Sequence, residues 1–166
     1  MSLIPLKVED LNPEAFSPFG DVMDTEGKSI SINQGTTERF HDLASIDVTE
    51  NAGRPALSIF RAQPRPRPIA VKLMERHPLS SQAFFPLGNQ PYLVLVAPVA
   101  EKPDARELKC FLARGNQGVN YRRNVWHHPL LAIDIETDFI VVDRDAEDEN
   151  CDEYYFSDDL QISIDY

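Results

Sequence analysis

Apolar and polar residues alternate in short blocks along most of this chain, and turn-forming residues separate the blocks. The segment 29–33 reads Ser-Ile-Ser-Ile-Asn, the period-two pattern of a strand with one face turned to a core. Strands are expected at 29–33, 56–61, 69–77, 82–86, 92–97, 108–113, 119–123, 131–135, 139–143 and 152–156. Many short strands at roughly regular spacing are typical of a β-sandwich or barrel.

Helical signals are few. All 13 prolines precede residue 130, and proline breaks a helix internally, so long helices are not expected. Asn12 followed by Pro13 predicts one or two helical turns at 12–16, and 103–110 is a candidate for another short helix. No internal repeat or linker divides the chain. We therefore expect a single all-β domain over residues 1–166, with one or two short helices.

Charge and targeting signals narrow the classes of function. The net charge of −11 disfavours nucleic acid and anionic membranes as partners. The segment 134–166 holds 13 acidic residues and one basic residue, so residues 1–133 are close to neutral and can receive a small anion. The start lacks a secretory signal, and the longest apolar run, 92–100, is too short to cross a bilayer. A cytoplasmic protein is expected.

Two blocks carry candidate chemistry. Residues two apart in a strand share a face, so Glu75 and His77 point the same way, and a turn after His77 would bring Gln82 beside them. In the second block, His127 and His128 are adjacent, and a regular strand could turn only one of them into a given cavity. Two interpretations of these residues remain open: a metal site, and a polar barrel mouth in which they only form hydrogen bonds.

The two blocks resemble a degenerate pair of cupin motifs. The first usually reads Gly-x5-His-x-His-x(3–4)-Glu-x6-Gly, where this chain has Glu75, His77, Gln82 and Gly88. The second includes Pro-x-Gly-x-x-His, and its last position is His127. Because a neutral Gln82 replaces the expected carboxylate, it is a weaker cation ligand than the motif usually supplies.

Several ordered blocks resemble the ureidoglycolate lyase family over roughly residues 16–153. They read ERFHDLA (38–44), RAQP (61–64), ERHP (75–78), QAF (82–84), QGVNY (117–121) and RNVWHHP (123–129), with later matches at 137–139, 143–144 and 150–152. The resemblance implies a bacterial cytoplasmic homodimer with a cupin-like β-sandwich. It further implies cleavage of (S)-ureidoglycolate to glyoxylate and urea in allantoin degradation, with nickel as an associated cofactor.

Residue chemistry laid over these motifs gives each candidate a role. His77 and His127 are candidates for metal ligand or general base, because a histidine pKa lies near working pH. Glu75 and Gln82 would complete the metal pocket, and Tyr121 or His128 would supply a hydrogen-bond donor. The candidates for binding the substrate outside the metal pocket are Arg61, Arg76 and Arg123 for its carboxylate and Asn33 for its ureido group.

Two other functions fit the same residues. One is a hydrolase that acts on ureidoglycolate and releases ammonia in place of urea. The other is a cupin-like module that binds a small carboxylate without turning it over, which the altered metal motif favours. Product analysis separates the first from a lyase, and ligand-dependent stabilisation without turnover would identify the second.

Overall fold

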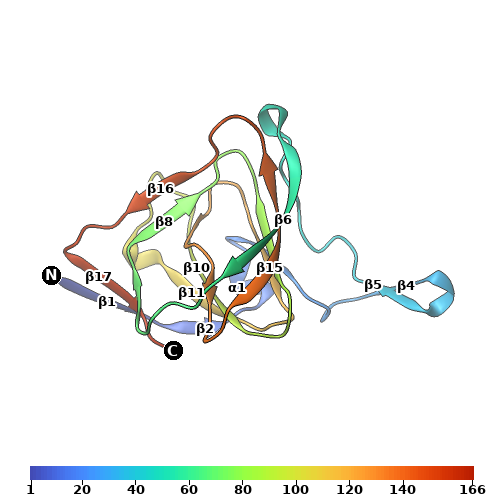
Figure 1. Ribbon diagram of the computed structural model, residues 1–166, viewed down its shortest axis with the longest axis horizontal. Helices are drawn as coiled ribbons and strands as arrows, with labels where there is room; N and C mark the ends of the chain where they lie inside the picture. Colours follow the sequence, from blue (N-terminus) through green and yellow to red (C-terminus); the bar gives the residue numbers. More distant parts are fainter.

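Strand β10 (Tyr92–Ala97) is the central strand of the fold, and all six of its residues are buried. The computed structural model covers residues 1–166 (Figure 1). Alternate β10 side chains enter two different cores: Tyr92, Val94 and Val96 join one, while Leu93, Leu95 and Ala97 join the other. A strand covered on both faces explains why this stretch is the longest apolar run in the sequence.

The middle layer is a seven-stranded sheet built around β10. Its path runs β16-β8-β13-β10-β11-β2, and β14 also pairs with β10. Its other members are β2 (Val8–Asp10), β8 (Leu73–Arg76), β11 (Lys109–Ala113), β13 (Trp126–His127), β14 (Leu131–Ala132) and β16 (Asp152–Tyr155).

A five-stranded sheet covers one face of this layer, in the order β3-β12-β9-β15-β6. Its strands are β3 (Gly20–Met23), β6 (Arg54–Ala62), β9 (Gln82–Pro86), β12 (Gly118–Tyr121) and β15 (Thr137–Asp145). Phe84, Val119 and Phe139 from this sheet pack in the same core as Tyr92 and Phe111 of the middle layer. The two sheets thus form the expected all-β, cupin-like sandwich.

A three-stranded sheet, β1-β17-β7, covers the other core. It contains β1 (Ser2–Leu6), β7 (Ile69–Val71) and β17 (Leu160–Ile164). Strands β1 and β17 pair in parallel, so the first and last strands of the chain lie side by side (Figure 1). No helix is long and apolar enough to cross a membrane.

The short helix predicted at 12–16 is confirmed as α1 (Pro13–Phe16). The Asn12 side chain accepts a hydrogen bond from the Ala15 amide at 2.9 Å, and Phe16 is buried in the first core. The prediction of a helix at 103–110 is wrong, since only a 3₁₀ turn at Ala105–Glu107 forms there before β11 begins. Leu108 has extended backbone angles, and its side chain packs in the second core.

Other boundaries also differ from the expected strands. The segment 69–77 divides into β7 and β8, which belong to different sheets. The strand expected at 131–135 ends at Ala132, because Asp134 has a positive φ of 65° and turns the chain. A two-stranded hairpin, β4 (Ile30–Ile32) and β5 (Thr37–Arg39), projects away from the three sheets at the right of Figure 1.

Candidate active site

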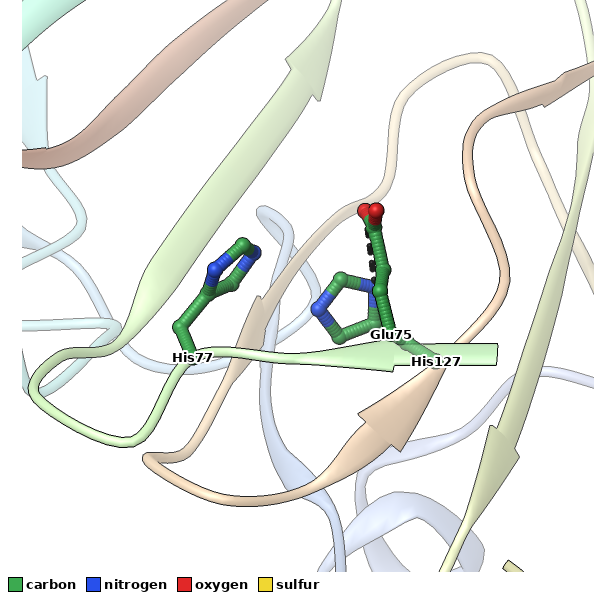
Figure 2. A group of neighbouring side chains, drawn as sticks. All are labelled: Glu75, His77 and His127. Atoms are coloured by element: carbon green, nitrogen blue, oxygen red, sulfur yellow. Dashed lines mark ion pairs between the residues drawn. The ribbon is translucent and has the colours of Figure 1, made fainter. Parts of the chain in front are cut away.

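Glu75, His77 and His127 form a cluster of metal-ligand side chains (Figure 2). Glu75 lies on β8 and His77 directly follows that strand, so the two share a face as expected. His127 is the cross-strand partner of Glu75 in β13. One donor atom from each residue lies within 4.8 Å of the other two. Two imidazoles and a carboxylate make a donor set that suits several divalent transition metals.

Hydrogen bonds fix the orientation of His77. Its Nδ1 lies 2.7 Å from the Asn150 carbonyl oxygen, and its Nε2 lies 2.9 Å from Gln82 Oε1. The Gln82 amide nitrogen donates to Asp143 Oδ2 at 3.1 Å, which turns the amide oxygen toward His77. Both ring nitrogens therefore face acceptors. A neutral imidazole has a single N–H, so when Nδ1 donates to Asn150, Nε2 has no proton and can bind an ion.

His127 carries an unpartnered nitrogen deep in the protein. Its Nε2 is buried and has no hydrogen-bond partner, although most buried polar atoms have one. The ring stacks on Tyr121 with centroids 4.3 Å apart, and Nδ1 lies 3.8 Å from Glu75 Oε1. Burial holds the pKa of His127 well below 6.5, and the nearby His77 lowers it further. A neutral imidazole with a free nitrogen is the form in which histidine binds metals.

Burial also raises the pKa values of the acidic side chains at the site. It raises the pKa of the Glu75 carboxyl, and the interaction with His77 partly opposes this rise. It raises the pKa of Tyr121 as well, so the phenol keeps its proton at neutral pH. The Tyr121 hydroxyl makes no hydrogen bond within the chain, which leaves it free to donate to a ligand.

A cavity of about 110 Å³ lies against the cluster. Its walls are Phe60, Glu75, Gln82, Phe84, Tyr121, His127, His128, Pro129 and Leu130. Both His127 and His128 line this cavity, which corrects the expectation that only one of them could. Strand β13 ends at His127 and Pro129 follows, so strand alternation does not govern His128.

His128, which lines this cavity, has one ring nitrogen engaged by the next residue. Its Nδ1 lies 2.8 Å from the Pro129 carbonyl oxygen, which can only accept, so Nδ1 holds the ring proton and Nε2 has none. Burial lowers the pKa of His128 to about 4. Tyr121 and His128 were both expected as possible hydrogen-bond donors, and of the two only His128 has its N–H engaged within the chain.

The four residues expected to bind the substrate outside the metal pocket are not brought to this cavity. Arg61 pairs with Asp138 at 2.9 Å on the edge strand β6. Arg76 points to the other face of β8, where it pairs with Asp152 and lies over the Trp126 ring. The other two are also engaged elsewhere: Arg123 pairs with Asp47 and Glu50, and Asn33 in the projecting hairpin donates to Thr37.

Two residues that support the cluster were absent from the sequence-based candidates. Asp143 orients Gln82, and Asn150 accepts from His77 through its carbonyl oxygen. The Asn150 side chain also accepts from the Leu79 amide and donates to Ser80, which holds the turn after His77. Both lie in family-like blocks (143–144 and 150–152), but only the pairing of distant strands brings them to the site.

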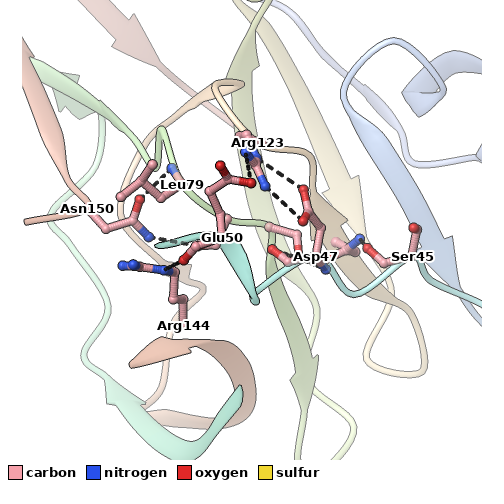
Figure 3. Close-up of polar contacts among 10 residues, drawn as sticks. Ser45, Asp47, Glu50, Leu79, Arg123, Arg144 and Asn150 are labelled. Carbon is pink, nitrogen blue, oxygen red and sulfur yellow. Dashed lines mark hydrogen bonds and ion pairs between the residues drawn. The ribbon is translucent and has the colours of Figure 1, made fainter. Parts of the chain in front are cut away.

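Two arginines bind the segment 47–53, which follows the projecting hairpin (Figure 3). Arg123 pairs with Asp47 at 2.9 Å, and Arg144 Nε donates to the Glu50 carbonyl oxygen at 3.1 Å. A Cβ on Gly53 would lie 2.4 Å from Arg144 Nε, so glycine permits this close approach. Ser81, beside the turn after His77, exchanges backbone and side-chain hydrogen bonds with Asp47. Hydrogen bonds between Asp47 and Ser81 therefore connect this segment to the turn that follows His77 in the cluster.

Replacing Arg144 by Ala is expected to lower the free energy of unfolding by about 2 kcal/mol, because charged donors are lost from two carbonyl groups. The Arg144 side chain is only 1% exposed. The control is Arg54→Ala, which removes an exposed pair with Asp145 and should change stability by less than about 1 kcal/mol. Urea unfolding measures both, and equal effects would contradict this account of the segment.

Nearly the whole sequence is similar to that of known proteins. The sequence model of a family described as ureidoglycolate lyase matches residues 3–163. A ureidoglycolate lyase from Burkholderia cepacia is 58% identical over 151 residues, which cover 89% of this chain and 84% of that protein. Another, from Pseudomonas syringae pv. syringae (strain B728a), is 47% identical over 161 residues, or 96% of this chain and 95% of that protein.

One solved structure shows a weaker similarity. A dTDP sugar isomerase from Desulfovibrio desulfuricans G20 aligns with a TM-score of 0.49 and 14% identity. The alignment covers 82% of this chain and 85% of that chain. A similarity of this size is too low to support an assignment.

Proposed function

The chain belongs to the ureidoglycolate lyase family, and from that premise we propose that it cleaves (S)-ureidoglycolate to glyoxylate and urea at the Glu75–His77–His127 cluster. The observation that carries this placement is the buried, unpartnered Nε2 of His127 beside a small cavity. Membership of the family makes the protein a lyase, and its place in allantoin nitrogen use follows from the substrate.

The reaction requires one proton to leave the substrate and one to enter it. The bond between the hydroxyl-bearing carbon and the ureido nitrogen breaks, and the hydroxyl loses its proton as the aldehyde of glyoxylate forms. The departing nitrogen gains a proton and becomes an amino group of urea. A site for this reaction needs an acceptor near the hydroxyl and a donor near the nitrogen.

His128 and Tyr121 have the protonation states that these tasks need. His128 Nε2 is unprotonated because Nδ1 holds the ring proton, so Nε2 can accept the hydroxyl proton. The Tyr121 hydroxyl is protonated at neutral pH, as an ordinary phenol is, and it has no partner within the chain. It can therefore donate to the departing nitrogen. Transfer of a proton from His128 back to Tyr121 resets the pair after each turnover.

The residues present fit a divalent metal ion. Glu75, His77 and His127 would hold it, and the unpartnered His127 Nε2 together with the converging donor atoms supports this role. When bound, such an ion would act as a Lewis acid that lowers the pKa of the substrate hydroxyl. Nickel is our proposal for its identity, from the family resemblance and because imidazole ligands suit nickel.

Three broader properties are part of the same proposal. We take residues 1–166 as one catalytic domain, which the family match over 3–163 and the pairing of β1 with β17 support. On the family resemblance, we propose a homodimer that acts in the cytoplasm on a small anionic substrate, and the net charge of −11 argues against nucleic acid as a partner.

Product analysis with (S)-ureidoglycolate tests the function directly. We expect urea and glyoxylate in equal amounts, loss of turnover on adding a chelator, and recovery on adding Ni²⁺. Urea, ammonia and glyoxylate are assayed together. Ammonia in place of urea would make the protein a hydrolase. A protein that glyoxylate stabilises thermally, but that gives no turnover with nickel or manganese, would be a carboxylate-binding module.

A further inference from the structure

A larger and more open cavity, of about 580 Å³, adjoins the 110 Å³ cavity at the cluster. The two share the walls formed by Phe60, Pro129 and Leu130. The inner cavity has room for only a few water-sized groups, so part of a bound ureidoglycolate must extend past these shared walls. The outer cavity is therefore where the remaining part of the substrate would lie.

Two arginines line the outer cavity, and their partners differ. Arg61 Nε lies 2.9 Å from Asp138 and 3.4 Å from Glu136, so its charge is already balanced. Arg65 forms no ion pair and no hydrogen bond through its side chain. Arg67, farther along the same loop, pairs with Asp134 and donates to the carbonyl oxygen of Tyr166. Arg65 is thus the free cation of this loop.

The position of Arg65 relates it to the inner cavity. Arg65 lines the outer cavity together with Phe60, Pro129 and Leu130, which also line the inner cavity. The two cavities therefore meet at walls that Arg65 shares. The loop around Arg65 contains Pro64 and Pro66, whose fixed φ angles restrict the backbone that carries it.

We propose that Arg65 binds the carboxylate of the substrate at the boundary between the two cavities. A planar guanidinium can donate two parallel hydrogen bonds to a carboxylate, and Arg65 has no competing partner. This assignment rests on the proposed function and replaces Arg61, Arg76 and Arg123, whose charges are engaged elsewhere. It makes Arg65 the residue that selects α-substituted carboxylates over their uncharged amides.

The test is Arg65→Gln, with Arg67→Gln as the matched control on the same loop. We expect Arg65→Gln to raise KM for ureidoglycolate by about 10- to 100-fold, with kcat within about threefold of wild type. The inhibition constant of glyoxylate should rise in parallel. Arg65→Lys keeps the charge but not the paired donors, so its KM should lie between those of the wild type and Arg65→Gln. Arg67→Gln should keep the wild-type KM.

An unchanged KM and glyoxylate affinity in Arg65→Gln would overturn the assignment. So would an equal rise in Arg67→Gln, because the loop would then act only through its total charge. Direct titration of each protein with glyoxylate by calorimetry separates this inference from the function itself. If the wild type fails to cleave ureidoglycolate, the proposed function fails, while the difference in glyoxylate affinity still decides the role of Arg65.

Discussion

Replacing Glu75 by Gln is expected to lower kcat/KM for ureidoglycolate by about 10²- to 10⁴-fold, the range typical of a lost group in acid–base or metal chemistry. Glu75 supplies the only carboxylate of the cluster and lies 3.8 Å from His127 Nδ1. Gln has nearly the same shape and no charge, so it fills the same space. Metal affinity should fall with activity, because a neutral amide is the weaker ligand.

The matched control is Glu153→Gln. Glu153 pairs directly with Glu75 across β16 and β8, and its charge raises the pKa of Glu75, but it is exposed and outside the cluster. Its activity should stay within about threefold of wild type. Steady-state kinetics, metal content and thermal melts are measured for both variants. Near-normal turnover in a folded Glu75→Gln protein would remove the cluster from the mechanism.

The sequence predicted those parts of the fold in which local pattern and final environment agree. Strands β9 and β10 have the predicted limits, since apolar runs bounded by turn residues match strands of this length. Strand β1 was missed because it contains Pro5 and lies at a sheet edge, where pairing with β17 supplies the order. The helix expected at 103–110 failed because burial of Leu108 favours an extended chain.

Part of the candidate site could also be predicted from the sequence, and part of it could not. Strand alternation and an expected turn brought Glu75, His77 and Gln82 together, and family-like motifs added Tyr121 and His127. Asp143 could not be predicted, because it reaches Gln82 only through the pairing of β9 with β15. A free arginine also cannot be told from a paired one in a sequence, since pairing depends on the fold.

A second large effect is expected on stability in mild acid: the free energy of unfolding should fall as the pH drops from 7 toward 4. The folded-state pKa of His128 is about 4, against an ordinary value of 6.5, and burial is its main cause. Above pH 6.5 neither state binds the proton. Below it, the unfolded chain binds a proton that the folded chain does not, so stability is lost as the pH falls.

His128 alone accounts for about 3 kcal/mol across that range, and buried His127 acts in the same direction. Glu75 opposes this loss at the acidic end, because its raised pKa makes the folded state take up a proton there first.

Urea unfolding with a chelator present, at pH 7.5, 6.5 and 5.5, measures the effect without metal linkage. His128→Gln removes one titrating group, so its unfolding free energy should depend less on pH than that of the wild type. Between pH 7.5 and 5.5 the difference should reach about 1.4 kcal/mol, and Glu75 is present in both proteins and largely cancels. Parallel pH curves for the two proteins would mean that His128 titrates alike in the folded and unfolded states. That result would contradict the pKa of His128 that burial lowers to about 4.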